Sequence, residues 1–311
     1  MNQAEVPGVA VNARSITLVT IISVVYLLLS RYLVGFKSDE VVLVIICNAL
    51  FYLAPITRKF ITGFCIFVVY WIIFDYMKAF PNYNYNPVHI KDLYDFDKSL
   101  FGIRYNDKLI TANEYWLINH TTAVDVITGL FYLCWIPVPL GFATYLFFTH
   151  KKEFLYFALT FFTVNILGFI VYYIYPAAPP WYVQLHGFQF FPHTTAHIGG
   201  LARFDKFFHT SVFKGIYTKG SNVFAAMPSL HSAYPVIVLF YGLKNRLGWI
   251  NIFFAIVMLG IWFTAVYASH HYVVDVLSGI VCAITGILLF FFIARFNRLQ
   301  SFLNRYAKVI S

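Results

Sequence analysis

Charged residues are scarce in this chain of 311 residues. Only 11% of the residues are charged, whereas ordinary soluble domains carry about 25%. Hydrophobic residues make up 60% of the chain and aromatic residues 21%, and the mean hydropathy is +0.71. This composition excludes a soluble globular protein and indicates a multi-pass membrane protein.

A long polar segment is also missing. Apolar runs recur from residue 15 to residue 295, so we expect an integral membrane domain and no separate soluble domain. The four cysteines fall inside these runs without close pairs, and they say nothing about the redox compartment.

Acidic residues are few: 13 Asp and Glu residues stand against 22 Lys and Arg residues, which gives a formal net charge of +9. The Lys and Arg residues are scattered over short loops and the C-terminal tail and do not form a stripe, so we expect no nucleic-acid partner. Basic residues at the ends of spans favour the cytoplasmic side and attract anionic lipid. The partner that the charge indicates is therefore the bilayer.

Apolar runs of roughly 20 residues can cross a bilayer as helices. The sequence predicts eight of them, near residues 15–34, 40–56, 60–80, 123–148, 154–175, 227–243, 248–268 and 272–294. The expected fold class is therefore all-α, an integral membrane helical bundle with about eight transmembrane helices.

The basic residues predict how these spans are oriented. With eight spans they fall on one side, which the positive-inside rule makes cytoplasmic, at Arg14, Arg58, Lys59, Lys151, Lys152, Lys244, Arg246, Arg295, Arg298, Arg305 and Lys308. Both termini are then cytoplasmic, and we expect the first apolar run to be retained as a span. The opposite side receives the short loop with Arg31 and Lys37, segment 81–122, segment 176–226 and the two histidine motifs described below.

Segment 81–122 is rich in Tyr and contains Trp116. Because Tyr and Trp favour the headgroup level, we expect short helices along the membrane interface. The segment either roofs a site or only anchors the bundle.

The first histidine motif is Met227-Pro228-Ser229-Leu230-His231. Proline suits the first turn of a helix, so we expect the sixth span to start near Met227. The free amides of that turn and the Ser229 hydroxyl would then form a phosphate site, with His231 one turn further along.

The second motif contains His271 and Asp275, which share one helix face because they are four residues apart. The carboxylate can hold one imidazole nitrogen protonated and leave the other free to attack phosphorus. We expect His271 to be the nucleophile and His231 the acid and base. The alternative is that both histidines are interior polar residues that bridge helices.

Trp181 follows a proline-rich turn that ends the fifth span. It is a candidate substrate-binding residue, although a helix stop with an aromatic belt would explain the same pattern. His193 and His197 have the spacing of metal ligands, but no Cys or carboxylate converges on them. We therefore expect no metal and no cofactor.

These motifs carry a family resemblance. Pro228 to His231 resembles the Pro-Ser-Gly-His motif of the type 2 phosphatidic acid phosphatase superfamily, and His271 to Asp275 resembles its His-x-x-x-Asp motif. Further stretches are similar to its inositol phosphorylceramide synthase branch, namely Leu100 to Gly102, Ala178 to Tyr182, Val223 to His231 and His270 to Tyr272. The similarity extends from about Asp92 to Gly279.

The resemblance implies a six-helix catalytic domain over residues 59–311, preceded by a two-span extension over residues 1–58. It also implies the roles of nucleophile for His271, its carboxylate for Asp275 and acid/base for His231.

One departure concerns charge. The superfamily's phosphatases have Lys and Arg in a first motif and an Arg six residues before the nucleophile, whereas this chain has a proline-rich turn and Ala265. The phosphate charge would then be balanced by other residues, for which we consider His270, Lys78, Arg203 and Lys219. A phosphodiester, which carries one negative charge, fits this shortage better than a phosphomonoester.

The sequence therefore predicts a membrane lipid phosphotransferase that moves phosphoinositol, or a related headgroup, from a phosphatidylinositol-like donor to a ceramide-like acceptor through a phosphohistidine, releasing diacylglycerol. The alternatives are a lipid phosphatase acting on a phosphomonoester or polyprenyl diphosphate, and a lipid-binding protein with an inert site. The active site would face the periplasm in a bacterium or the Golgi lumen in a eukaryote. An accessory subunit and a homo-oligomer both stay open.

Overall fold

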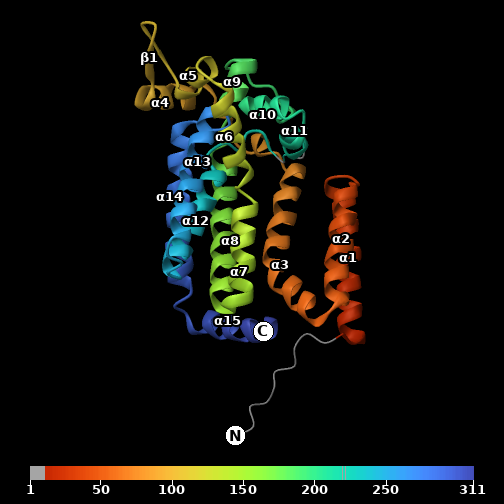
Figure 1. Ribbon diagram of the computed structural model, residues 1–311. Helices are drawn as coiled ribbons and strands as arrows, with labels where there is room; N and C mark the ends of the chain where they lie inside the picture. Colours follow the sequence, from red (N-terminus) through yellow and green to blue (C-terminus); the bar gives the residue numbers. More distant parts are fainter. Residues whose placement is uncertain (1–10, 219, 221) are drawn as a thin grey trace. The chain divides into compact units, whose positions relative to one another are not determined.

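The computed structural model describes residues 11–218, 220 and 222–311 and is almost entirely helical (Figure 1). The longer helices are α1 (Ala13–Leu33), α2 (Ser38–Leu53), α3 (Pro55–Tyr76), α6 (Thr122–Leu133), α7 (Pro137–Thr149), α8 (Lys151–Ile174), α12 (Leu230–Lys244), α13 (Ile250–Tyr267), α14 (Val273–Ile293) and α15 (Asn297–Ile310). The short elements are η1 (Met77–Ala79), η2 (Asn82–Asn84), α4 (Lys91–Phe101), β1 (Ile103–Tyr105), β2 (Lys108–Ile110), α5 (Ala112–Ile118), α9 (Pro180–His186), η3 (Gly199–Leu201), α10 (Ala202–Phe207) and α11 (Val212–Tyr217).

Every predicted span is helical, which confirms the helical membrane bundle. Among the described residues, six helical segments are long and apolar enough to cross a membrane, while α2 and α12, with 16 and 15 residues, are shorter. The fourth span was predicted as one helix over 123–148, but it is divided into α6 and α7 by a turn before Pro137. Proline cannot donate a backbone hydrogen bond within a helix, so a new helix begins there.

The described residues divide into two compact units, and the first comprises residues 11–80, 143–162 and 290–311. Within it α2 packs on α1 and α3, and α15 packs on α3. Polar contacts join these helices, since Asn48 donates to the Ser23 hydroxyl and Tyr306 to the carbonyl of Thr62. The predicted domain boundary at residue 58 stays a prediction.

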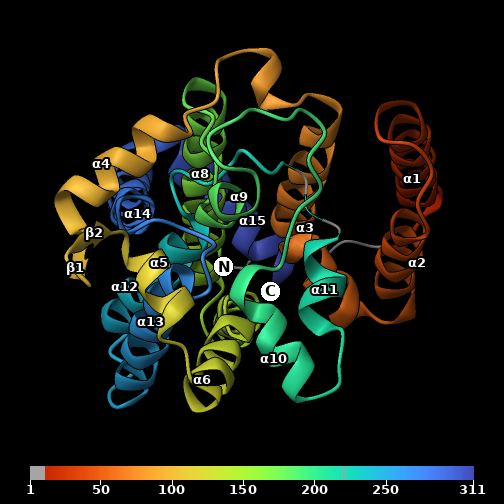
Figure 2. The same cartoon turned by 90° about the horizontal axis from the view of Figure 1, so that it is seen from above.

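The second unit comprises residues 81–142 and 163–289. In it α13 packs along α12 and α6, around a buried core of Tyr132, Leu201, Phe204, Phe213, Val257, Ile261, Ala265, Ala268 and Val276. The short elements α4, α5, α9, α10 and α11 gather at one end of these helices (Figures 1 and 2). This end carries both histidine motifs.

Segment 81–122 contains short helices, as predicted, and also a β-hairpin that the sequence analysis missed. Asn106 and Asp107 form its two-residue turn with φ angles of 46° and 59°. Asn and Asp tolerate positive φ better than most residues, so this dipeptide was the available signal.

Candidate active site

A tight turn between α13 and α14 carries His271. Ser269 lies in the left-handed region with φ of 58° and ends α13. The carbonyl of Ala265 then accepts hydrogen bonds from the backbone amides of both His270 and His271, at 3.0 and 2.9 Å. The last turn of α13 therefore fixes the position of the second motif.

The first motif lies at the start of α12, which begins at Leu230 and not near Met227 as predicted. Ser229 is the N-cap, and its hydroxyl accepts from the backbone amide of Ser232. A serine cap satisfies an amide that a helix start leaves free, so Pro228 precedes the helix and is not part of its first turn. Ser229 is fully buried and caps the helix that carries His231.

The two motifs are joined through their backbones as well. The amide of Ser229 donates to the carbonyl of Asp275 at 2.9 Å. Gly279 lies against Ser229 so closely that an added Cβ would be 2.2 Å from the Ser229 carbonyl oxygen. The absence of a side chain at Gly279 therefore lets α14 approach the start of α12.

This packing brings the catalytic candidates together. His231 Nδ1 lies 3.2 Å from His271 Nε2, and His271 Nδ1 lies 3.6 Å from Asp275 Oδ2. The same Asp275 oxygen accepts the backbone amide of Tyr272 at 2.8 Å. His271 is 5% exposed and Asp275 is fully buried.

The chemistry follows from this burial. Desolvation lowers the pKa of His271 to about 4, so its imidazole is neutral at pH 7. Nδ1 lies 3.6 Å from the Asp275 carboxylate, which is longer than a hydrogen bond. A proton on Nδ1 would leave the lone pair on Nε2, the nitrogen beside His231. Such a histidine can attack phosphorus, and Asp275 can stabilise the imidazolium that forms.

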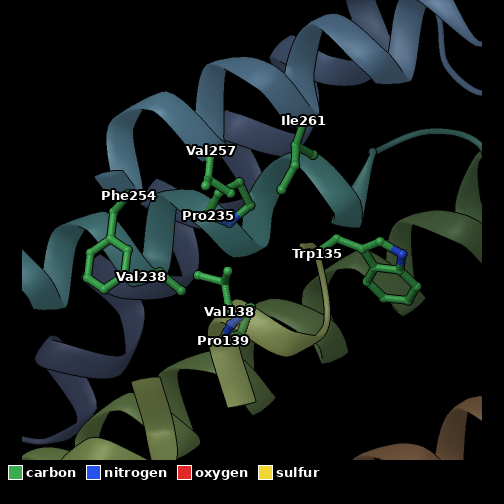
Figure 3. Close-up of a pocket in the computed structure, with 8 residues that line it drawn as sticks. All are labelled: Trp135, Val138, Pro139, Pro235, Val238, Phe254, Val257 and Ile261. Atoms are coloured by element: carbon green, nitrogen blue, oxygen red, sulfur yellow. The ribbon is translucent and has the colours of Figure 1, made fainter. Parts of the chain in front are cut away.

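Aromatic rings surround His231. Trp135 meets its ring edge-on at 4.6 Å between centroids, and Tyr132 lies at 5.3 Å. Trp135 also lines a small apolar pocket, together with Pro235 of α12 and Phe254 of α13 (Figure 3). Pro235 cannot donate to the carbonyl of His231 four residues earlier, so the first turn of α12 lacks that hydrogen bond.

Two predicted substrate-binding residues are buried in the second unit. His270 is 4% exposed, its Nε2 lies 3.1 Å from the carbonyl oxygen of Ile198, and its ring stacks on Tyr132 and Tyr217. Trp181 is 5% exposed, and its backbone amide donates to the carbonyl of Ser269. Both residues border the turn that carries His271, and their contact with substrate stays a prediction.

The predicted lysines are not brought to this site by any described contact. Lys78 lies in the first unit, 2.5 Å from Asp75, which is also 4.0 Å from Lys37. Lys219 lies outside the described residues. Their role toward the phosphate stays a prediction.

Arg203 of α10 is largely committed to the protein. Its Nε donates to Asp125 at 2.6 Å, and Asp125 also accepts from the Tyr267 hydroxyl at 2.7 Å. A second guanidinium nitrogen is buried without a hydrogen-bond partner among the described residues. The arrangement joins α6, α10 and α13 and neutralises much of the arginine's charge.

Sequence reasoning missed three buried side chains of segment 81–122 that hold the backbone of the second unit. Asn113 donates to the carbonyls of Val266 and His271 at 2.8 and 2.9 Å. Asp97 accepts from the amide of Val274 at 3.0 Å and so caps α14. The segment does more than anchor the bundle, because it fixes both ends of the turn that carries His271.

Asn82 makes a comparable clamp elsewhere in the same unit. It donates to the carbonyls of Tyr172 and Phe224 at 2.8 and 2.7 Å. The signal that could have identified these residues is weak, since a lone Asn or Asp in a polar segment is usually exposed.

The region that contains the site matches a known protein family. A profile described as the PAP2 superfamily matches residues 91–289. A phosphoinositol dihydroceramide synthase of Bacteroides thetaiotaomicron is 41% identical over 295 residues, which cover 94% of this chain and 97% of the relative. Inositol phosphorylceramide synthases of Candida albicans and Saccharomyces cerevisiae are 27% and 28% identical, over 78% and 73% of this chain. The aligned regions span 50% and 56% of these two longer relatives, and no solved structure matches.

Proposed function

Because this chain belongs to the PAP2 superfamily, we propose that it is a membrane phosphotransferase for sphingolipid synthesis. It transfers phosphoinositol from a phosphatidylinositol-type donor to the primary hydroxyl of a ceramide or dihydroceramide, and diacylglycerol leaves. The observation that carries this function is the juxtaposition of His231 and His271 at 3.2 Å, in a chain 41% identical to a phosphoinositol dihydroceramide synthase.

The reaction proceeds in two displacements. His271 Nε2 attacks the donor phosphorus, the bond from phosphorus to the diacylglycerol oxygen breaks, and His231 gives that oxygen a proton. The phosphoinositol group is then bonded to His271. The ceramide hydroxyl attacks the same phosphorus, His231 takes up its proton, and the bond to His271 breaks.

Asp275 supports both displacements. When His271 carries the phosphoryl group its ring is cationic, and the buried carboxylate beside Nδ1 offsets that charge. The carboxylate also keeps the ring oriented so that Nε2 faces the donor.

The orientation in the membrane is part of the proposal. The basic residues at the predicted span ends support cytoplasmic termini and an active site on the opposite face. Single cysteines can be placed at Asp107 in the hairpin and at Arg298 in α15, after replacement of the four native cysteines. An impermeant maleimide added to the non-cytoplasmic side should label the first and not the second, and the reverse would overturn this orientation.

The activity is tested with purified protein, phosphatidylinositol labelled in its inositol phosphate, and ceramide. We expect label in phosphoinositol ceramide and stoichiometric diacylglycerol. Release of free phosphate or inositol phosphate with no labelled sphingolipid would contradict the transferase and support a lipid phosphatase. Lipid profiles of cells with and without the gene provide the matching test in vivo.

A further inference from the structure

Two buried tyrosine hydroxyls near His231 and His270 lie beside each other, and neither forms a hydrogen bond with any other described residue. They belong to Tyr132 of α6, whose side chain is fully buried, and to Tyr217 of α11. Both rings stack on His270, with interplanar angles of 12° and 18°. The Tyr132 ring also contacts His231 at 5.3 Å between centroids.

Two hydroxyls that face only each other leave at least one hydroxyl hydrogen without an acceptor. Buried polar groups in native proteins usually have a hydrogen-bond partner, so this pair can donate to a group that binds there. Burial raises the pKa of Tyr217 above its usual value, so the phenol stays protonated at neutral pH and can donate a hydrogen bond.

The surrounding charges indicate what kind of acceptor fits. Ala265, which stands where phosphatases of the superfamily carry Arg, lies in the same buried cluster as Tyr132. Arg203 is paired with Asp125. Neutral donors in place of free cations suit an acceptor with one negative charge, which is the charge of a phosphodiester and not of a phosphomonoester.

We propose that the hydroxyls of Tyr132 and Tyr217 donate hydrogen bonds to the non-bridging phosphate oxygens of the donor lipid. This inference rests on the proposed function, because a phosphodiester is the donor only if phosphoinositol is transferred. The two tyrosines then bind the phosphate in place of the cations that the chain lacks.

The test uses Tyr132→Phe and Tyr217→Phe in the full chain. Each substitution should raise the KM for phosphatidylinositol about tenfold, because one hydrogen bond to a charged group is lost. The thermal midpoint of the lipid-free protein should change little, since each hydroxyl faces only the other tyrosine and holds no further part of the chain. A purely structural hydroxyl would lower the thermal midpoint and leave the KM unchanged.

Tyr182→Phe is the matched control. Tyr182 is also fully buried in the second unit, but its hydroxyl donates to the carbonyl of Gln189 and accepts the amide of Phe191, both at 2.8 Å. This variant should lower the thermal midpoint and leave the KM within about twofold of the wild-type value.

Inhibition by orthovanadate tests whether the tyrosines bind the phosphate or the inositol ring of the donor. Orthovanadate has phosphate-like geometry but carries no lipid and no sugar. Its inhibition constant should rise with the KM in both tyrosine variants. An unchanged inhibition constant would contradict phosphate binding, and so would an unchanged KM in variants of an active enzyme. A wild-type protein that makes no phosphoinositol ceramide would instead overturn the proposed function.

Discussion

His231 Nδ1 and His271 Nε2 lie 3.2 Å apart although their residues are 40 positions apart in the chain. His231 is the second residue of α12. It meets the turn after α13 because the Ser229 amide donates a hydrogen bond to the Asp275 carbonyl. The geometry places a proton donor beside the atom that would attack phosphorus.

Alanine substitutions of the two histidines should differ in their effects. His271→Ala removes the nucleophile and should abolish turnover, while donor binding, measured by equilibrium binding of a labelled lipid, should largely survive. His231→Ala should lower kcat by about 10²–10⁴-fold, the usual contribution of general acid–base catalysis. Full activity of His271→Ala would exclude the covalent route.

Asn113→Ala should impair catalysis through the position of His271. Loss of two buried hydrogen bonds should lower the free energy of unfolding by about 2–3 kcal/mol. The released carbonyl of His271 should also let the turn shift, and a shift of about 1 Å can reduce kcat roughly 100-fold. Steady-state kinetics and thermal denaturation in detergent measure the two effects.

Asn82→Ala is the control for this prediction. Asn82 is equally buried and also donates to two backbone carbonyls, but neither belongs to the turn that carries His271. It should lose similar stability with a smaller loss of kcat. If Asn82→Ala and Asn113→Ala lose the same stability and the same kcat, Asn113 has no specific positioning role.

Asp97→Asn should stabilise the protein in a pH-dependent way. Burial raises the pKa of Asp97 to about 6, and the nearby charge of Asp275 contributes to the rise. A raised carboxyl pKa means that stability is lost as pH rises from about 4 through 6, because the folded state must then hold the buried charge. The Asn side chain keeps an acceptor for the Val274 amide. It should add roughly 1–3 kcal/mol to the free energy of unfolding at pH 7.5 but little at pH 4.

Asp97→Leu separates charge from capping. It removes the acceptor for the Val274 amide as well as the carboxylate, so it should be less stable than Asp97→Asn at both pH values. Thermal melts from pH 4 to 8 give the comparison. A larger stability gain of Asp97→Asn at pH 4 than at pH 7.5 would contradict a raised pKa of Asp97.

The ion pair of Asp125 and Arg203 should behave as a coupled unit. Removing one partner leaves a buried charge and should cost about 3–5 kcal/mol. The double variant Asp125→Leu with Arg203→Met should lose clearly less stability than the sum of the losses in the two single variants. Additive losses in a denaturation cycle would show that the two side chains do not compensate each other.

Much of the fold was accessible from hydropathy because the helices form wherever apolar runs are long. The start of α12 was misplaced because Pro228 and Ser229 are both common near helix starts, and only the hydrogen bond to Ser232 decides between them. The break before Pro137 was missed because the apolar run continues through it.

The candidate site was predictable only in part. His231, His271 and Asp275 were accessible because polar residues in apolar runs are conspicuous. Asn113 and Tyr132 were not, since their importance depends on partners far away in the chain, the carbonyl of His271 and the ring of His231. Pairings between residues so far apart leave no periodic pattern in a single sequence.

The central claim is that phosphoinositol passes through His271, and a chase experiment tests it most directly. Donor labelled in its inositol phosphate is mixed with excess protein without acceptor, and then ceramide is added. We predict acid-labile label on His271, none in His271→Ala, and its transfer to phosphoinositol ceramide on the chase. Absence of label on His271 during turnover, or a chase that releases only inositol phosphate, would contradict the account.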